Sequence, residues 1–202
     1  MVPSMSPAGP GRKLRYEDLA ALPDDGCRHE LIDGEHFATA APVPLHQRVL
    51  TRLAHSLSAH VAATGGGEVL IGPVDVVLSP HDVLEPDLIF VSDARSHLVT
   101  DKCVVGPPDI VVEILSLSTR RRDRTVKRRL YMEAGVLEYW IVDSGRGTVS
   151  VHRAAAPASP TTLSTPPGRE ESLELLAAQG GALESPLLPG WQLRLADLLR
   201  LS

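Results

Sequence analysis

Two acidic residues stand in apolar stretches of this chain, where an unpaired charge is costly. Glu113 lies inside the apolar run of residues 110–115, and Asp87 opens the apolar run of residues 87–91. A lone ionised carboxylate in a dry sheet is strongly unfavourable, so such a group is usually paired, protonated or functional. The basic segment 119–129 follows Glu113 closely and holds seven Lys or Arg residues and one Asp. Two acids near a basic helix predict metal-assisted cleavage of phosphodiester bonds.

The size and composition of the chain are those of an ordinary globular domain. It has 202 residues, and we expect residues 14–202 to form a single domain behind a disordered tail of residues 1–13. Hydrophobic residues make up 43% and charged residues 22%, so a core can form without disulfides. Aromatic residues make up only 3%, so few rings are free to stack on nucleobases.

Charge and cysteine content narrow the class of protein further. The formal net charge of -5 argues against a protein that coats nucleic acid through bulk positive charge, so any binding must be local. Two cysteines are too few for a disulfide scaffold and lack the spacing of a zinc site, which favours a cytoplasmic protein. We find no run of about 18 apolar residues and no signal-like N-terminal segment, so we expect neither a membrane span nor export.

The elements expected in the N-terminal part are a hairpin and a long helix. Residues 27–36 predict a hairpin, because Asp33-Gly34 is a pair that tolerates the positive φ of a type I′ turn. Residues 45–63 predict a helix, since apolar residues recur every four positions there and three glycines follow. A short helix is expected over residues 16–22.

The elements expected further along form a sheet. Strands are predicted over residues 68–78, 87–91, 110–115, 138–143 and 148–153, and a helix over residues 122–134. The run 110–115 is almost continuously apolar, which implies cover on both faces. The predicted fold is α/β or α+β, with a mixed central sheet flanked by helices and an additional N-terminal hairpin. We expect a mobile Ala/Pro-rich loop over residues 154–168 and a strand followed by an apolar helix over residues 185–201.

An ordered series of short motifs runs through the chain: Glu30-Leu-Ile-Asp-Gly-Glu35, His46-Gln47, Pro86-Asp87, Val112-Glu113-Ile-Leu-Ser116, Ser118-Thr119, Arg122-Asp123, Lys127, Tyr131, Gly135-Val136 and Glu138-Tyr-Trp-Ile-Val-Asp143. The series resembles the Uma-two family of restriction-type endonucleases, within the PD-(D/E)XK nuclease superfamily. The resemblance extends from about residue 14 to the C-terminus. It implies a restriction-endonuclease-like fold and a Mg²⁺-dependent endonuclease that hydrolyses DNA, with Mn²⁺ as a substitute ion.

The resemblance implies roles for three residues and departs from the superfamily pattern at one position. Asp87 and Glu113 match the two acids that hold the metal, and the carbonyl of Ile114 would be a further ligand. The superfamily has a lysine two residues after the second acid, but this chain has Leu115, which can neither bind a metal nor donate a hydrogen bond. Lys127 is the migrated lysine that the family offers. A structural ion pair between Glu113 and Lys127, or a turn role for Asp87, remains the alternative.

Further residues are auxiliary candidates. Glu30 is expected either near the metal as an auxiliary acid or on the surface of the hairpin. His46 and Gln47 match the family's His-Gln pair, which could point into the cleft; hydrogen bonding at the start of a helix is the alternative and the slightly favoured one. Asp75 is an auxiliary acid only if it joins the acidic cluster, and is otherwise a turn or edge residue.

The basic segment supplies the expected nucleic-acid contacts: Arg120, Arg121, Arg122, Arg124 and Arg128. Such contacts would bind the phosphate backbone and would not read base sequence. The alternative for these arginines is a solvated helix face. For the whole chain, the alternative to an endonuclease is a catalytically inactive, nuclease-like module that binds nucleic acid or regulates another protein. We expect a homodimer, because two active sites are a common route to double-strand cleavage and an apolar C-terminal segment is present; self-association without catalysis is a third possibility.

Overall fold

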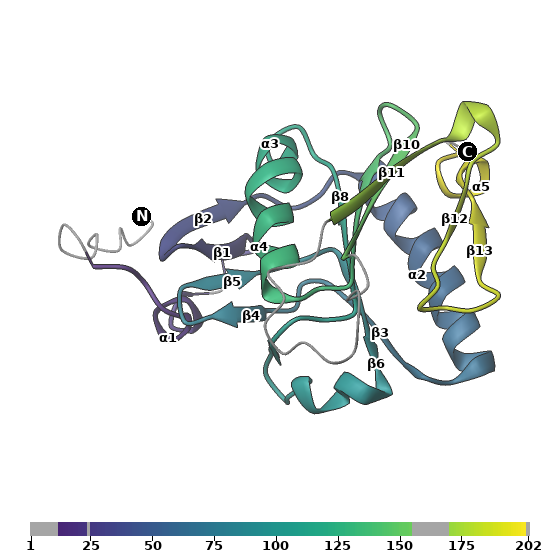
Figure 1. Cartoon of the computed structure of the whole chain (residues 1–202). Coiled ribbons are helices and arrows are strands. Elements are labelled where there is room, and N and C mark those ends of the chain that lie inside the picture. Colours follow the sequence, from purple (N-terminus) through teal and green to yellow (C-terminus); the bar gives the residue numbers. More distant parts are fainter. Residues whose placement is uncertain (1–11, 24, 155–169, 201–202) are drawn as a thin grey trace.

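The computed structural model describes residues 12–23, 25–154 and 170–200. The expected disordered tail of residues 1–13 and the expected loop of residues 154–168 lie outside these ranges, apart from residues 12, 13 and 154. The described residues form two mixed sheets with helices on both faces, which confirms the expected α+β class (Figure 1).

A six-stranded sheet forms the centre of the molecule. Its strands run in the order β11-β10-β9-β8-β6-β3, with bounds β3 Gly67–Ile71, β6 Leu88–Ser92, β8 Ile110–Ile114, β9 Glu138–Asp143, β10 Thr148–Ala154 and β11 Glu170–Leu176. Strands β8 and β9 pair in parallel, and the other neighbours are antiparallel. Every residue of β8 and β9 is buried, as expected for apolar strands covered on both faces.

A five-stranded sheet lies beside the first and contains the predicted hairpin. Its order is β2-β1-β5-β4-β7, with bounds β1 Arg28–Ile32, β2 Glu35–Thr39, β4 Val76–Ser79, β5 Asp82–Leu84 and β7 Val104–Val105. Positive φ values at Asp33 (52°) and Gly34 (76°) confirm the turn between β1 and β2.

The strand predicted over residues 68–78 is wrong as a single element. It is two strands, β3 and β4, which belong to different sheets. Pro73 lies between them and has no N–H to donate, so the ladder of β3 cannot continue through it. The chain therefore leaves one sheet and enters the other at this point.

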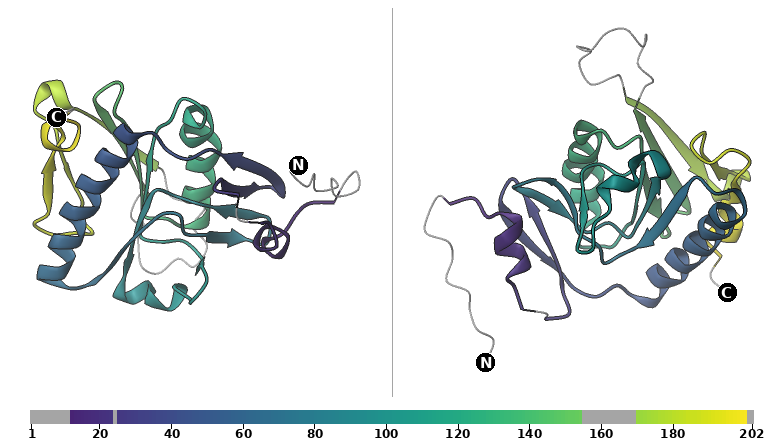
Figure 2. Two further views of the ribbon diagram at one scale, coloured as in Figure 1. Left: turned by 180° about the vertical axis from the view of Figure 1, so that it is seen from behind. Right: turned by 90° about the horizontal axis from the view of Figure 1, so that it is seen from below.

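Two long helical segments cover opposite faces of the six-stranded sheet, as the views in Figures 1 and 2 show. Helix α2 (Pro44–Thr64) packs its apolar side on one face. On the other face, a continuous segment comprises α3 (Arg120–Arg122), a π-helical turn η2 (Asp123–Lys127) and α4 (Arg128–Ala134). It begins two residues before the predicted start and ends at Gly135, whose φ is 98°.

The C-terminal segment packs back on the body of the molecule. It contains β12 (Ala182–Glu184), β13 (Gln192–Arg194) and α5 (Leu195–Leu198). Trp191 stacks on Trp140 with ring centroids 5.6 Å apart, and its indole N–H donates to Ser56 Oγ on α2 at 3.0 Å. The buried apolar residues of this segment therefore serve the core of their own chain. They no longer support self-association, and the homodimer stays a prediction.

The remaining elements are short: α1 (Tyr16–Ala20), the 3-10 turn η1 (Asp93–Leu98) and the 3-10 turn η3 (Ala177–Gln179). Cys27 and Cys103 are free thiols. Within the described ranges, no helix is both long enough and apolar enough to cross a bilayer.

Candidate active site

The two acids singled out from the sequence lie side by side at one end of the six-stranded sheet. Glu113 is the penultimate residue of β8, and Asp87 immediately precedes β6. Strands β6 and β8 are antiparallel neighbours in which Leu88 pairs with Val112, so the next residue outward on each strand is an acid. Both carboxylates are almost completely buried.

Asp87 is saturated by protein donors. Its Oδ1 accepts from Arg28 Nη1 at 2.5 Å, and its Oδ2 accepts from His46 Nε2 at 3.0 Å and from the backbone N–H of Ile114 at 2.7 Å. Burial acts to raise the pKa of Asp87, but the hydrogen bond from His46 and the charges of His46 and Arg28 outweigh it, so the pKa lies below its usual value. Asp87 is therefore an anion held by donors from three separate elements.

Glu113 is paired with the lysine that the family resemblance proposed. Lys127 Nζ lies 2.8 Å from Glu113 Oε1, and the hydroxyl of Tyr131 donates to the same oxygen at 3.3 Å. Both of these hydrogen bonds go to Oε1, and none to Oε2 of Glu113 is found among the described residues. Lys127 is the last residue of the π-helical turn, a kind of irregularity that is frequent at functional sites.

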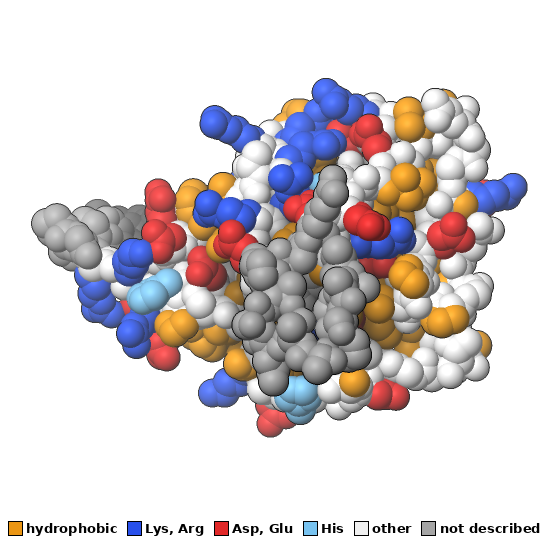
Figure 3. Space-filling view, viewed as in Figure 1, with side chains coloured by type: hydrophobic (Ala, Val, Ile, Leu, Met, Phe, Trp, Pro, Cys, Tyr) orange, Lys and Arg blue, Asp and Glu red, His pale blue; other side chains and the backbone are white. Residues whose placement is uncertain are grey.

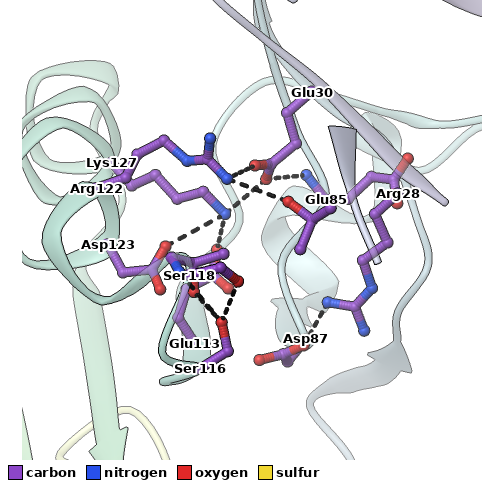
Figure 4. Close-up of polar contacts among 12 residues, drawn as sticks. Arg28, Glu30, Glu85, Asp87, Glu113, Ser116, Ser118, Arg122, Asp123 and Lys127 are labelled. Carbon is purple, nitrogen blue, oxygen red and sulfur yellow. Dashed lines mark hydrogen bonds and ion pairs between the residues drawn. The ribbon is translucent and has the colours of Figure 1, made fainter. Parts of the chain in front are cut away.

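Lys127 neutralises more than one acid. Its Nζ also lies 2.6 Å from Glu30 Oε1 and 3.6 Å from Asp123 Oδ1, and Figure 4 shows the ammonium between the three carboxylates. Burial alone would lower the pKa of Lys127, but the charges of Glu113, Glu30 and Asp123 raise it above the usual value. The lysine therefore stays a cation at neutral pH.

The cluster holds more acids than cations. Burial raises the pKa of Glu113 well above its usual value, with further increases from the charges of Asp123, Asp87 and Glu30, although Lys127 opposes them. Burial also raises the pKa of Asp123. Burial is the largest cause of both shifts and the neighbouring acids add to it, so a divalent cation bound at the site would lower both pKa values.

Glu30 joins the site from the neighbouring sheet. Besides Lys127, it meets Arg122, whose Nη2 lies 3.5 Å from Glu30 Oε2, and it accepts the backbone N–H of Glu85 at 3.1 Å. The guanidinium of Arg122 also lies over the ring of Phe37, 4.7 Å from its centroid. Glu30 is therefore buried in the acid cluster and not on the surface of the hairpin, and its role as an auxiliary acid near a metal stays a prediction.

A cavity of about 440 Å³ opens over these residues. Asp87, Glu113 and Lys127 line it, together with the loop after β8 and residues 39–43. In the loop after β8, Ser116 Oγ lies 3.0 Å from Ser118 Oγ and 2.9 Å from Thr119 Oγ1, so three hydroxyls gather there. The site thus combines a charged floor with neutral hydrogen-bonding groups at its side.

The five arginines predicted to contact DNA have different surroundings. Lys and Arg side chains gather over α3 in Figure 3, but among the five only Arg120 lines the cavity. Arg120 and Arg124 are tied to buried Asp143 at 3.4 and 3.1 Å, and Arg128 lines a separate cavity beside Glu170. Arg121 is exposed, whereas Arg122 faces Glu30 and Phe37.

The structure separates the remaining auxiliary candidates. His46 reaches the cavity and binds Asp87, whereas its neighbour Gln47 is exposed and lines another pocket on α2. Asp75 is not among the residues of the cavity; its carboxylate accepts a hydrogen bond from Tyr16, and burial raises its pKa. Ile114 lines the cavity, and its described contact is the N–H donated to Asp87; ligation by its carbonyl stays a prediction.

Sequence reasoning missed two residues of the site, Arg28 and Glu85. Both line the cavity, and Arg28 makes the 2.5 Å contact with Asp87. Arg28 lies within the predicted hairpin of residues 27–36, and Glu85 immediately precedes Pro86-Asp87, so both were close to motifs already identified. Nothing in their spacing indicated that β1 would lie against the start of β6.

The residues present fit a divalent cation of the magnesium type. Mg²⁺ prefers oxygen ligands and is commonly held by one or two carboxylates together with waters and substrate phosphates. Asp87 and Glu113 supply two adjacent carboxylates, and within the described ranges no hydrogen bond reaches Glu113 Oε2. No cluster of three or more His, Cys, Asp or Glu residues suited to a metal occurs in the described part of the chain. The side-chain ligands of any ion here would therefore be the two carboxylates, supplemented by the predicted Ile114 carbonyl and by waters or substrate oxygens.

Comparisons with known proteins bear on the family and the fold of the chain. The uncharacterized protein slr1290 of Synechocystis sp. is 29% identical over 143 residues, which are 69% of this chain and 73% of the relative. A crystal structure described as "a putative nuclease belonging to DUF820 from Anabaena variabilis ATCC 29413" superposes with a TM-score of 0.73 at 17% identity, covering 92% of this chain and 97% of that one. At that identity the likeness shows a shared fold. Residues 16–196 match the family Uma2, described as "Putative restriction endonuclease", and the chain belongs to that family.

Proposed function

We propose that the protein is a Mg²⁺-dependent endonuclease that hydrolyses phosphodiester bonds of DNA. The observation that carries the proposal is the grouping of Asp87, Glu113 and Lys127 on the floor of one cavity. Asp87 and Glu113 would hold the ion, and Mn²⁺ would substitute for Mg²⁺ because it accepts the same oxygen ligands. The Uma2 family and the fold shared with the Anabaena protein support a nuclease.

The chain's own residues have distinct tasks in this proposal. A bound divalent ion would supply Lewis acidity toward a phosphate and a water. Asp87 is fixed by His46 and by the Ile114 N–H, so its carboxylate is oriented before substrate arrives. Glu113 would contribute Oε2, which accepts no hydrogen bond from the described residues.

Lys127 acts as a cation in this proposal and not as a general base. Its raised pKa keeps the ammonium protonated at neutral pH. It therefore cannot accept a proton from water, but it can orient Glu113 and offset negative charge that develops on the phosphate. This role agrees with its position on the helix, from which its side chain reaches back to the end of β8.

Contacts with the DNA backbone would come from the side of the cavity. Arg120 and the hydroxyls of Ser116, Ser118 and Thr119 line it, and they suit phosphate oxygens. Arg121 is exposed at the start of the same helical segment. Because such contacts are electrostatic, DNA affinity should fall steeply as salt is raised.

The test compares two isosteric variants with the wild-type protein. Asp87→Asn and Glu113→Gln remove one negative charge each from the proposed ligand set. We expect both to lose Mg²⁺ binding in calorimetry and to reduce nicking of supercoiled plasmid by at least about 100-fold, since metal-dependent steps contribute several kcal/mol to such reactions.

The matched control is Glu138→Gln. Glu138 is a buried acid of the same sheet that pairs with Arg153 and Trp140 and does not line the cavity. This variant should keep both metal binding and nicking. Wild-type activity in folded Glu113→Gln protein would refute the proposed role of Glu113.

One observation favours the alternative of a nucleic-acid-binding module without catalysis. Both oxygens of Asp87 are engaged by protein donors, and Leu115 replaces the lysine of the superfamily pattern. This alternative predicts salt-dependent DNA binding with no product in Mg²⁺ or Mn²⁺. Nicking that depends on Asp87 would exclude it.

A further inference from the structure

Arg28 makes the shortest of the contacts that hold Asp87. Its Nη1 lies 2.5 Å from Asp87 Oδ1, and its side chain is only 18% exposed. Charge-assisted contacts of this kind are among the stronger hydrogen bonds of proteins. Arg28 therefore supplies positive charge at an oxygen that a divalent ion would also need.

A second acid, Glu85, lies next to Arg28 (Figure 4). Glu85 lines the same cavity, and its Oε1 accepts the backbone N–H of His29 at 3.2 Å. Its Oε2 is buried and has no hydrogen-bond partner among the described residues. A buried carboxylate oxygen without a donor is costly, so it would stabilise a guanidinium that moved toward it. Figure 4 shows Glu85 and Arg28 next to each other above Asp87.

We infer that Arg28 is a positioning residue that competes with the divalent ion for Asp87. In the ion-free protein it holds Asp87. Once an ion binds, Arg28 turns to Glu85 and presents its remaining N–H groups to the substrate phosphate. This inference rests on the proposed nuclease function and adds a residue that neither the motif series nor the metal ligand set contains. Arginine suits the role, because its planar group offers five donors and can bind two anions at once.

The exchange has an electrostatic reason. An ion at Asp87 and Glu113 would repel a guanidinium that remained on Asp87. Glu85 offers Arg28 a negative partner a short distance away, so the arginine need not leave the cavity. Lys127 and Arg122 do not compete for this partner in the present arrangement, since both are paired with Glu30.

The first test is calorimetric titration of Mg²⁺ and Mn²⁺ into Arg28→Met protein. Removal of the competitor should tighten metal binding by about tenfold or more relative to wild type, because the ion no longer has to displace one charge-assisted hydrogen bond at Asp87. Arg122→Met is the matched control, because Arg122 is a second arginine of the acid cluster but pairs with Glu30 and not with Asp87. The change in metal affinity of Arg122→Met measures how much affinity is gained by deleting any nearby positive charge.

A second variant should change the metal affinity in the opposite direction. Glu85→Gln removes the alternative partner of Arg28, so metal binding should weaken, and the weakening should be largely lost in the double variant Arg28→Met/Glu85→Gln. An equal loss in both backgrounds would mean that Glu85 acts on the metal without Arg28. Unfolding temperatures measured without metal would verify that each variant is folded.

A third measurement examines the phosphate contact. Anisotropy of a labelled DNA duplex with the protein in Ca²⁺ should show weaker binding for Arg28→Met although its metal binding is tighter. Tighter metal binding with unchanged duplex affinity would overturn the phosphate contact.

The outcomes separate failure of this inference from failure of the proposed function. If wild-type protein binds Mg²⁺ through Asp87 but Arg28→Met binds no more tightly than Arg122→Met, the inference is overturned and the nuclease proposal stands. If neither wild-type nor Arg28→Met protein binds a divalent ion, both are overturned.

Discussion

Lys127 is the residue on which the acid cluster depends. Its buried ammonium lies within 4 Å of three carboxylates, those of Glu30, Glu113 and Asp123. The three acids are contributed by a strand of one sheet, a strand of the other sheet and the helical segment itself. A single buried cation thus joins three parts of the fold, in addition to any role it has in catalysis.

Removal of this cation should destabilise the protein strongly. Lys127→Met keeps most of the side-chain volume but removes the cation beside Glu113 and leaves Glu30 with Arg122, and breaking a buried ion pair in this way typically costs about 3–5 kcal/mol. Urea unfolding would measure the loss, with exposed Lys102→Met as the control. Adding Glu113→Gln to Lys127→Met should recover part of the stability, because one uncompensated charge is removed. A loss no larger than that of the control would contradict the ion-pair geometry.

At the scale of elements, two irregularities build the site. The π-helical turn of η2 carries Asp123 and Lys127, both buried, into the acid cluster. The break at Pro73 ends β3 and allows the chain to cross into the second sheet as β4. Because of that crossing, β1 and its residues Arg28 and Glu30 lie against the end of β6 and β8.

Asp75 lies at this crossing. A substitution there should change the stability of the protein and leave its activity unchanged. Burial raises its pKa above the usual 3.8, which means that the folded protein keeps the proton to higher pH than the unfolded chain. Stability is therefore lost as pH rises from the unfolded value through the folded one. Asp75→Asn should remove this loss, so its stability relative to wild type should increase across that window and remain higher at neutral pH.

Urea unfolding at a series of pH values would test the Asp75 prediction. Asp101→Asn, at an exposed position, is the control and should change the pH profile little. Plasmid nicking by Asp75→Asn should equal that of wild type, because Asp75 is not among the residues lining the cavity. A loss of nicking in the folded variant would return Asp75 to the catalytic set.

At the scale of the whole molecule, the cavity lies where the two sheets meet. The six-stranded sheet provides the carboxylates of Asp87 and Glu113, and the five-stranded sheet provides Arg28 and Glu30. Helix α2 covers the opposite face of the central sheet and is held there by the C-terminal segment. Helix α2 contributes His46, from its first turn, to the cavity, whereas the C-terminal segment contacts α2 farther along, at Arg52 and Ser56.

Trp191 tests this separation along α2. Trp191→Ala removes the stacking on Trp140 and the hydrogen bond to Ser56, and should cost about 3–5 kcal/mol in urea unfolding. Trp191→Phe keeps an aromatic ring and should lose less. At a temperature where both variants are folded, Mg²⁺ affinity should match that of wild type. A weaker affinity would mean that the C-terminal segment also shapes the metal site.

The sequence by itself determined most of the elements and the acids of the site. Periodicity located α2, the Asp33-Gly34 pair located the hairpin, and continuous apolar runs located β8 and β9, because local backbone preferences and burial leave clear patterns. The family resemblance picked out Asp87, Glu113 and Lys127 as a group. The catalytic role of that group stays a prediction.

Only the tertiary structure decided which charges meet. Arg28 and Asp87 are 59 residues apart in the sequence, and the contact of Lys127 with Glu30 joins the helical segment to a strand of the five-stranded sheet. Side-chain patterns report which face of an element is buried but not which partner lies across it, so Arg28 and Glu85 were missed and the single strand over residues 68–78 was wrong. Long-range contacts of this kind depend on how the sheets pack, and packing is settled by the whole chain at once.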